Sequence, residues 1–427
     1  MRKNHIKIIA VILTCVMMMT SGQSLVCFGA FNKTTANTVA ANATISGLTA
    51  KAFAAIYFDS GEVVFSSDSG YEHYSVGNMI KLMTLYLAFE AVYAGKTDYN
   101  SGIKVSKAAQ NISVGRERVY LDAGKGEVIT VDQAITAICV GSANDAAYAL
   151  AEHISGTDET AFVAMMNAKA EELGMSNTHF MDSTGIKTID EGQYSCAVDM
   201  CVLSYNLVKN FPDVLAYTTM TSGSFHHTST GQPDTDMVSS NALVSSSMLE
   251  GADGLLVGYS KADLYAQAAT AMIDNERAVA VVIGEETPER RAGELKYLLQ
   301  HTVQSFERKR LAEEGTYVRM ISVKDGKVLK VKTCTGSDLY YIANLTQDYT
   351  VESKIVIDGE ICAPVSIGDV AGYILYEKVF APDENGNSER EEIGRIDLII
   401  NEDVDRAGWF TRLLRKILQF LGLMDYS

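Results

Sequence analysis

The chain has 427 residues, which is enough for two or three domains that each bury a hydrophobic core. Hydrophobic residues make up 47% of the chain and charged residues 21%, a composition that excludes an intrinsically disordered protein. The formal net charge is -17, whereas nucleic-acid binding depends on neutralising phosphates with Lys and Arg. Nucleic acid is therefore not an expected partner.

The N-terminus has the pattern of a secretory signal. Basic residues precede an apolar run at 8–19, which has the length of a signal-peptide core and is too short to span a bilayer comfortably. The small residues Gly29 and Ala30 follow this run, as at a signal-peptide cleavage site. We therefore expect a signal peptide over 1–30 that is cleaved after Ala30. An uncleaved anchor is the alternative. Residues 31–44 are small and polar and are expected to form a linker.

A mixed pattern of strands and helices follows. A buried strand at 52–58, a turn at 59–61 and a second strand at 62–65 predict a hairpin. Apolar residues at three-to-four spacing predict helices at 79–94, 131–155, 157–173, 196–209 and 294–310. A second strongly buried strand is expected at 279–284. These elements indicate one mixed domain of helices and strands over 45–312.

The composition changes near residue 316. Short strand-like pieces at 328–331, 354–358 and 373–376 are separated by Asp-Gly, Gly-Ser and Gly-Asp turns. This pattern predicts a small all-β domain over 316–402.

The C-terminal segment 405–424 has the pattern of a basic amphipathic helix. Its apolar residues recur at helical spacing and are Trp409, Phe410, Leu413, Leu414, Ile417, Leu418 and Leu421. Arg406, Arg412, Arg415 and Lys416 lie between them, and no acidic residue follows Arg406 until Asp425. Such a helix lies well in the interface of an anionic membrane, so we expect it to bind the membrane surface. A helix packed on the β domain or on a partner is the alternative.

The cysteines do not indicate a disulfide framework or a metal site. Seven are present, and five would survive signal cleavage, which is an odd number. No Cys-x-x-Cys or His-x-x-x-His spacing is present, so no metal and no cofactor are expected. Cys139 lies in an apolar run and is expected to be a small buried hydrophobic residue.

Three short motifs carry the chemistry. Serine acyl transfer without histidine needs a hydroxyl and a lysine amine one helical turn apart, so that the amine can take the hydroxyl proton. Here Lys81 opens an apolar helix, but Asn78 stands three residues before it. A Ser-x-Asn motif follows at 142–144, and Leu256-Val257-Gly258 stands where a Lys-Thr-Gly motif would complete such a site.

The order and surroundings of these motifs resemble the low-molecular-weight penicillin-binding proteins, the serine-type D-alanyl-D-alanine carboxypeptidases. Lys81-Leu82-Met83-Thr84 is similar to the end of that family's first motif without its serine, and Ser142-Ala143-Asn144-Asp145 is similar to its second motif region. Ser183-Thr184-Gly185, Asp253-Gly254-Leu255 and Cys362-Ala363-Pro364-Val365 also resemble family landmarks. The resemblance covers nearly everything from residue 45 onward.

The resemblance implies a fold and a set of roles. The expected fold is an α/β (α+β) transpeptidase/β-lactamase-like domain, followed by the small all-β domain and the C-terminal amphipathic helix. Lys81 matches the general base, and Ser142 and Asn144 match the serine and asparagine of the second motif. Asn78 occupies the position of the nucleophile. Leu256, Val257 and Gly258 occupy the positions of the substrate-binding Lys-Thr-Gly.

The resemblance also implies a place and a partner. The protein is expected to be secreted to the extracytoplasmic face of the cell membrane and the cell wall, with peptidoglycan stem peptides as its partners. An amide cannot form an acyl-enzyme, and the loss of such a nucleophile typically costs about a million-fold in rate. We therefore expect a catalytically impaired protein with a binding or regulatory role, for which β-lactam binding is doubtful.

Three alternatives stay open. The chain could be an active carboxypeptidase with rearranged machinery based on Lys81 and Ser142. The β domain could instead do the binding. Finally, Lys81 and Ser142 could persist only because they bond to each other and stabilise the domain, with Asn78 acting as a helix N-cap.

Overall fold

The computed structural model describes residue 45 and residues 47–112 and 117–421, so the predicted signal peptide and linker lie outside the described residues. The strands of the first domain are β1 Ala52–Tyr57, β2 Glu62–Ser66, β3 Gly102–Lys104, β4 Val128–Thr130, β5 Ser222–Phe225, β6 Thr235–Val238, β7 Ala252–Gly254, β8 Val257–Ser260, β9 Leu264–Ile273 and β10 Glu276–Glu285. Its helices are η1 Gly77–Ile80, α2 Lys81–Tyr93, α3 Lys107–Asn111, η2 Ala123–Lys125, α4 Val131–Gly141, α5 Asn144–Ser155, α6 Glu159–Glu172, η3 Ile189–Glu191, α7 Ala197–Asn210, α8 Val214–Thr218, α9 Ala242–Ser245 and α10 Pro288–Ser305.

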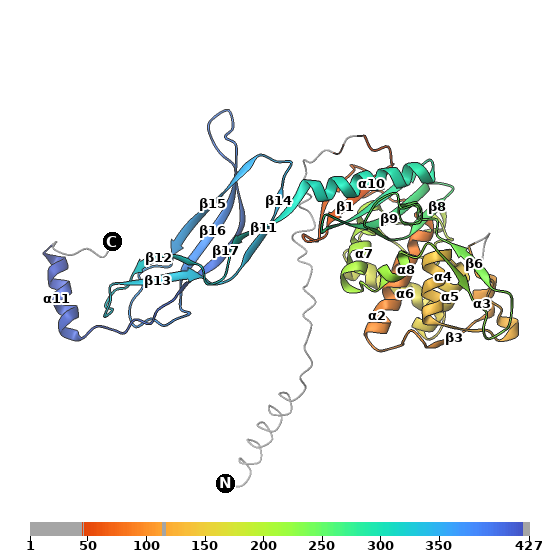
Figure 1. Cartoon of the computed structure of the whole chain (residues 1–427), viewed down its shortest axis with the longest axis horizontal. Coiled ribbons are helices and arrows are strands. Elements are labelled where there is room, and N and C mark those ends of the chain that lie inside the picture. Colours follow the sequence, from red (N-terminus) through yellow and green to blue (C-terminus); the bar gives the residue numbers. More distant parts are fainter. Residues whose placement is uncertain (1–44, 46, 113–116, 422–427) are drawn as a thin grey trace, which may run out of the picture. The chain divides into compact units, whose positions relative to one another are not determined.

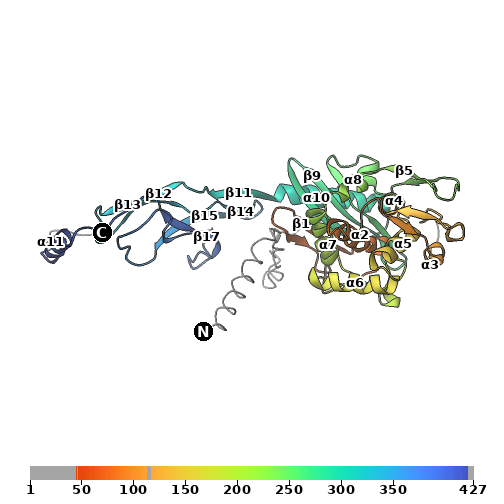
Figure 2. The same ribbon diagram turned by 90° about the horizontal axis from the view of Figure 1, so that it is seen from below.

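A central antiparallel sheet organises this domain, with strand order β2-β1-β10-β9-β7 and β8 also paired to β9 (Figures 1 and 2). Successive residues of a strand point to opposite faces. In β10, Val279, Val281 and Ile283 accordingly join one core with α2 and α7, whereas Ala280 and Val282 join a second core with α10. The sheet is therefore buried on both faces, and the predicted fold class is confirmed.

Helix α2 is buried on every side. Ten of its thirteen residues are buried, including Leu82, Leu85 and Phe89. A helix that is apolar all round belongs in a core rather than on a surface. The helix therefore forms a rigid support for the residues at its N-terminus, Asn78 and Lys81.

The prediction of one continuous helix over 131–155 is wrong, because the structure has two helices there. Helix α4 ends at Gly141, Ser142 adopts a left-handed conformation with φ 50°, and α5 begins at Asn144. The apolar spacing continues across the break, which is why the pattern suggested one helix. The break places Ser142 and Ala143 at a corner between the two helices, directly before the first residue of α5, Asn144.

The helix predicted over 294–310 begins earlier and ends earlier. Thr287 caps α10 by accepting a hydrogen bond from the backbone N–H of Arg290, and Pro288 occupies the first turn. Both are helix-start signals that precede the apolar repeat. At the other end, residues from Phe306 onward form strand β11, which pairs with β14. Pairing between strands distant in sequence overrides the helical pattern there.

The second domain is all-β. Its strands are β11 Phe306–Ala312, β12 Tyr317–Ser322, β13 Lys330–Thr335, β14 Leu339–Asn344, β15 Tyr349–Ile357, β16 Val370–Phe380 and β17 Arg390–Ile400. Five of them form a sheet with order β12-β13-β17-β16-β15, and β11 pairs with β14. Two small apolar clusters, one around Val323 and Val331 and the other around Ile374 and Leu398, form its interior.

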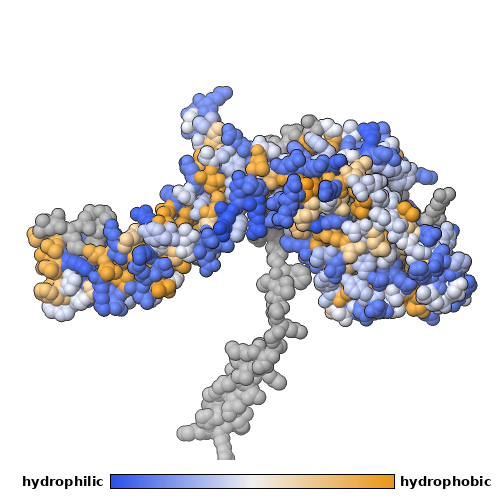
Figure 3. All heavy atoms as spheres, in the orientation of Figure 1, coloured by the Kyte–Doolittle hydropathy of each residue, from blue (hydrophilic) through white to orange (hydrophobic). Residues whose placement is uncertain are grey.

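The last described element is helix α11, Trp409–Phe420, and none of its residues is buried. Hydrophobic side chains are exposed over this helix (Figure 3), with Trp409 71% and Phe420 91% exposed. One described hydrogen bond, from Arg415 to the carbonyl oxygen of Gly326, joins it to the β domain. Within the described part of the chain, no helix is both long and apolar enough to cross a membrane.

Candidate active site

Three backbone segments meet closely at the N-terminus of α2. A Cβ atom at Gly258 of β8 would collide with the carbonyl oxygen of Val76, and one at Gly185 would collide with the carbonyl oxygen of Gly77. Glycine is therefore needed at both positions because other residues would push the backbones apart. These contacts bring the first and third predicted motif regions and the loop around Gly185 to one place.

Asn78 and Lys81 lie on one face of this helical turn and bond to each other. The Lys81 Nζ atom donates to Asn78 Oδ1 at 2.8 Å, and Asn78 Nδ2 donates to Glu117 Oε1 at 2.7 Å. The amide orientation is determined by its neighbours, since a flipped amide would place its oxygen against the carboxylate and its N–H groups against the ammonium. Asn78 therefore bridges a cation and an anion.

Lys81 is fully buried and also donates to the carbonyl oxygen of Thr184 at 2.6 Å. The loop that carries Thr184 is held by Asp182, whose carboxylate accepts from the backbone N–H groups of Thr184 and Lys187. Burial lowers the pKa of Lys81 to about 8, although the negative charges of Glu117, Asp182 and Asp145 oppose this shift. A larger fraction of Lys81 is consequently in the neutral amine form at neutral pH than for an ordinary lysine.

This lowered pKa predicts a pH-dependent stability. Between a folded-state pKa of about 8 and an unfolded-state pKa of about 10.4, the unfolded chain binds more protons, so stability rises with pH in this interval. Lys81→Met lacks the titrating amine and serves as the reference. The difference in free energy of unfolding, natural protein minus Lys81→Met, should increase by on the order of 3 kcal/mol from neutral pH to the top of this interval. Urea unfolding of both proteins across this range measures the difference. A constant difference would contradict the prediction.

The corner between α4 and α5 positions the second motif. Ser142 is partly exposed, whereas Asn144 is fully buried. The carboxylate of Asp145 accepts from the backbone N–H groups of Val119 and Leu121, and the backbone N–H of Asn144 donates to the carbonyl oxygen of Glu117. The start of α5 therefore holds the segment that presents Glu117 to Asn78.

Asn144 has an unusual side chain. Neither its Nδ2 nor its Oδ1 has a hydrogen-bond partner among the described residues, although both atoms are buried. A buried polar atom left unpaired costs about 1–3 kcal/mol. Among the described residues, no hydrogen bond offsets this cost at the Asn144 side chain.

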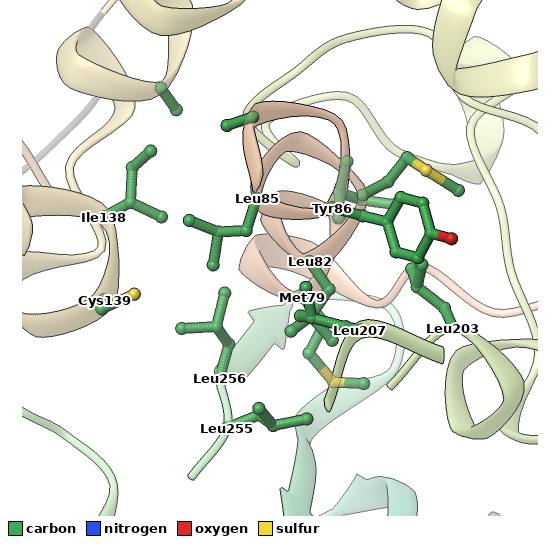
Figure 4. Close-up of a cluster of buried hydrophobic side chains, with 14 of the residues drawn as sticks. Met79, Leu82, Leu85, Tyr86, Ile138, Cys139, Leu203, Leu207, Leu255 and Leu256 are labelled. Carbon is green, nitrogen blue, oxygen red and sulfur yellow. The ribbon is translucent and has the colours of Figure 1, made fainter. Parts of the chain in front are cut away.

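The third motif has become part of the apolar core. Leu256 is 3% exposed and lies in a cluster with Met79, Leu85, Ile138 and Cys139 (Figure 4). Val257 begins strand β8, which pairs with β9. An apolar contact therefore occupies the position at which the sequence resemblance leads one to expect a lysine. Cys139 is buried, as predicted.

Two interpretations from the sequence are wrong in their contacts. The amine of Lys81 bonds to Asn78 and Thr184, and no described hydrogen bond joins it to Ser142. Asn78 is not an N-cap, because it lies within η1 and its side chain bonds to Glu117 and Lys81. His227, which belongs to none of the predicted motifs, is buried against Glu127, with Nδ1 and Oε1 2.6 Å apart.

Glu117 and Thr184 were missed as members of the network. Glu117 lies 39 residues from Asn78 in a segment without periodic pattern, so nothing in the sequence indicated the contact. Thr184 acts through its backbone oxygen, which no side-chain motif reveals. Among the described residues, no group of three or more His, Cys, Asp or Glu side chains is placed to hold a metal ion.

Comparison with known proteins gives a consistent assignment. The family profile described as "D-alanyl-D-alanine carboxypeptidase" matches residues 36–287, and that described as "Penicillin-binding protein 5, C-terminal domain" matches residues 306–406. The chain is 30% identical to D-alanyl-D-alanine carboxypeptidase DacF of Bacillus subtilis over 371 residues, covering 86% of this chain and 88% of that protein. It is 27% identical to DacC of Escherichia coli over 391 residues, covering 87% and 90%.

Solved structures agree on the fold. Penicillin-binding protein 5 from Haemophilus influenzae superimposes with a TM-score of 0.64 at 24% identity, over 86% of this chain and all of that chain. Penicillin-binding protein D2 from Listeria monocytogenes in its cefotaxime-bound form gives 0.52 at 25% identity, over 61% of this chain and 99% of that chain. With both profile matches and full-length relatives in agreement, the chain belongs to the D-alanyl-D-alanine carboxypeptidase family of low-molecular-weight penicillin-binding proteins.

Proposed function

We propose that this family member no longer hydrolyses D-Ala-D-Ala at an ordinary rate and instead has a binding or regulatory role on peptidoglycan stem peptides. One observation carries the proposal. The residue one helical turn before the site lysine is Asn78, whose carboxamide engages both Lys81 and Glu117. No hydroxyl is available at this position for acylation, and the lysine that would activate one is engaged elsewhere.

The parts of the site suited to ligand binding remain. Asn144 keeps a buried, unpartnered amide. Strand β8 pairs with β9 on one side, and no strand pairing is described along its other edge. An extended peptide can add to a free strand edge through main-chain hydrogen bonds, with side-chain groups providing specificity. These two features support binding of a stem peptide.

The test is a comparison of binding and turnover with a stem pentapeptide ending in D-Ala-D-Ala. We expect binding without measurable release of D-Ala, and we expect Asn144→Ala to weaken binding by about 10-fold or more, since one hydrogen-bonded amide is worth about 1–3 kcal/mol. Isothermal titration calorimetry and a D-Ala assay give the two readouts. Tyr297→Ala, at an exposed position on α10, is the control for a substitution away from the site.

Turnover at the rate of an ordinary family member would overturn the proposal. If Lys81→Ala abolished that turnover, the active alternative based on Lys81 and Ser142 would replace it. Binding that is unchanged in Asn144→Ala would remove this site as the binding surface and direct attention to the β domain.

We further propose that α11 attaches the protein to the extracytoplasmic membrane surface after secretion. Its exposed apolar residues and its cations are the support for this attachment, because amphipathic helices bind anionic interfaces through both.

A further inference from the structure

The side chains of Lys81, Asn78 and Glu117 are joined by hydrogen bonds at the start of α2, and their reactivity toward one another is separate from the proposed function. The amine nitrogen of Lys81 lies 2.8 Å from the carboxamide oxygen of Asn78, and the carboxamide nitrogen of Asn78 lies 2.7 Å from a carboxylate oxygen of Glu117. Lys81 is fully buried, and Asn78 is 8% exposed. A nucleophilic amine and an acyl group are therefore adjacent and shielded from water, and the exposed carboxylate of Glu117 contacts the acyl group's nitrogen.

We propose that Lys81 and Asn78 react with each other to form an intramolecular isopeptide bond. The Nζ–Cγ bond forms and the Cγ–Nδ2 bond breaks, so that the lysine amine becomes an amide nitrogen and one ammonia leaves. The reaction is an amide exchange without oxidation or reduction. It requires no co-reactant.

The proton balance can be met by the groups present. The amine attacks in its neutral form, and the nitrogen that has attacked must lose a proton while the departing nitrogen gains one. Glu117 accepts a hydrogen bond from the departing nitrogen, and its charge acts on Lys81, so its carboxylate is placed to carry this proton. Departure of ammonia rather than of an amide anion makes the exchange feasible.

Geometry and desolvation favour the reaction. Holding an amine against an acyl group converts a bimolecular step into an intramolecular one, for which effective concentrations of about 10⁵–10⁸ M are known. Burial also makes the neutral amine more available, because it lowers the pKa of Lys81 to about 8. The three-residue separation places both side chains on one helical face.

The bond would change the properties of the site. Lys81 would lose its titrating amine, so the pH-dependent stability difference predicted above belongs to molecules without the bond. Hydrolysis through Lys81 would also be excluded in the molecules that carry it. The inference does not depend on stem-peptide binding, and its test uses no ligand.

Peptide mapping of the purified full chain tests the bond. Trypsin should fail to cleave after Lys81 and should yield one peptide of residues 52–96, lighter by one ammonia than its sequence requires. Fragmentation should give no ions from cleavage between residues 78 and 81. A cyclic imide at Asn78 would lose the same mass but would leave Lys81 open to trypsin, so the two products are distinguishable.

Variants provide the controls. Lys81→Arg and Asn78→Ser should both give peptides of full mass, and Glu117→Gln should lower the linked fraction severalfold. Full cleavage after Lys81 in the natural protein, with residues 52–81 at their full mass, would overturn the proposal whether or not any variant folds. A linked fraction that is unchanged in Glu117→Gln would overturn the role of Glu117 as proton carrier.

Discussion

A labelled penicillin is expected to leave no covalent adduct on the natural protein, whereas the double variant Asn78→Ser, Leu256→Lys is expected to be acylated. Serine at position 78 would place a hydroxyl where the amide now contacts Lys81 Nζ at 2.8 Å. An amine at that position can accept the hydroxyl proton. Removal of such a nucleophile costs about 10⁶-fold in rate, so the contrast should be large. Intact mass after incubation measures it.

The single variants separate the two substitutions. Leu256 is 3% exposed within an apolar cluster, so a lysine there buries an ammonium group unless the site rearranges. An unpaired buried charge costs several kcal/mol, and we expect Leu256→Lys alone to lower the melting temperature. Asn78→Ser, which adds no charge, is the better-folded control and should show slow acylation.

An adduct on the natural protein would contradict this prediction. It would mean that another nucleophile operates, and Ser142, which is partly exposed at the corner between α4 and α5, would be mapped first. Absence of an adduct on every folded variant would mean that the pocket no longer admits a β-lactam.

Deletion of residues 405–427 is expected to release the protein from vesicles that contain anionic lipid. The segment carries four cations, each worth about 1 kcal/mol near an anionic surface, so charge alone accounts for about a thousandfold in binding. The exposed apolar residues of α11 add to this. Co-sedimentation with vesicles of phosphatidylglycerol and phosphatidylcholine measures the change.

Matched variants divide the effect between charge and apolar contact. Replacing Arg412, Arg415 and Lys416 with Gln should remove the salt-dependent part of the binding. Replacing Trp409 and Phe410 with Ser should weaken binding to neutral and anionic vesicles alike. Equal sedimentation of the truncated and the full-length protein would show that attachment does not depend on this segment.

Local patterns predicted much of the fold. The hairpin expected at 52–65 is β1 and β2, and the buried strand expected at 279–284 lies within β10. These elements followed from period and turn chemistry, which act between near neighbours. The missed start of α10 was also a local signal, since Thr287 and Pro288 mark it directly.

Other features depend on contacts between distant segments. The break at Ser142 interrupts a continuous apolar pattern, and strand β11 from Phe306 onward replaces a predicted helical end by pairing with β14. Neither can be read from neighbours in sequence, because a left-handed turn or a strand partner is selected by the packing of the whole domain.

The same division holds at the site. The sequence by itself determined the family, the absence of a serine at position 78 and the absence of a lysine at position 256. Only the tertiary structure decided that Asn78 bridges Lys81 and Glu117, that Thr184 holds the amine through its backbone, and that Leu256 belongs to the core. A motif specifies residue types along a chain, whereas hydrogen bonds and burial arise from segments that the fold brings together across more than a hundred residues.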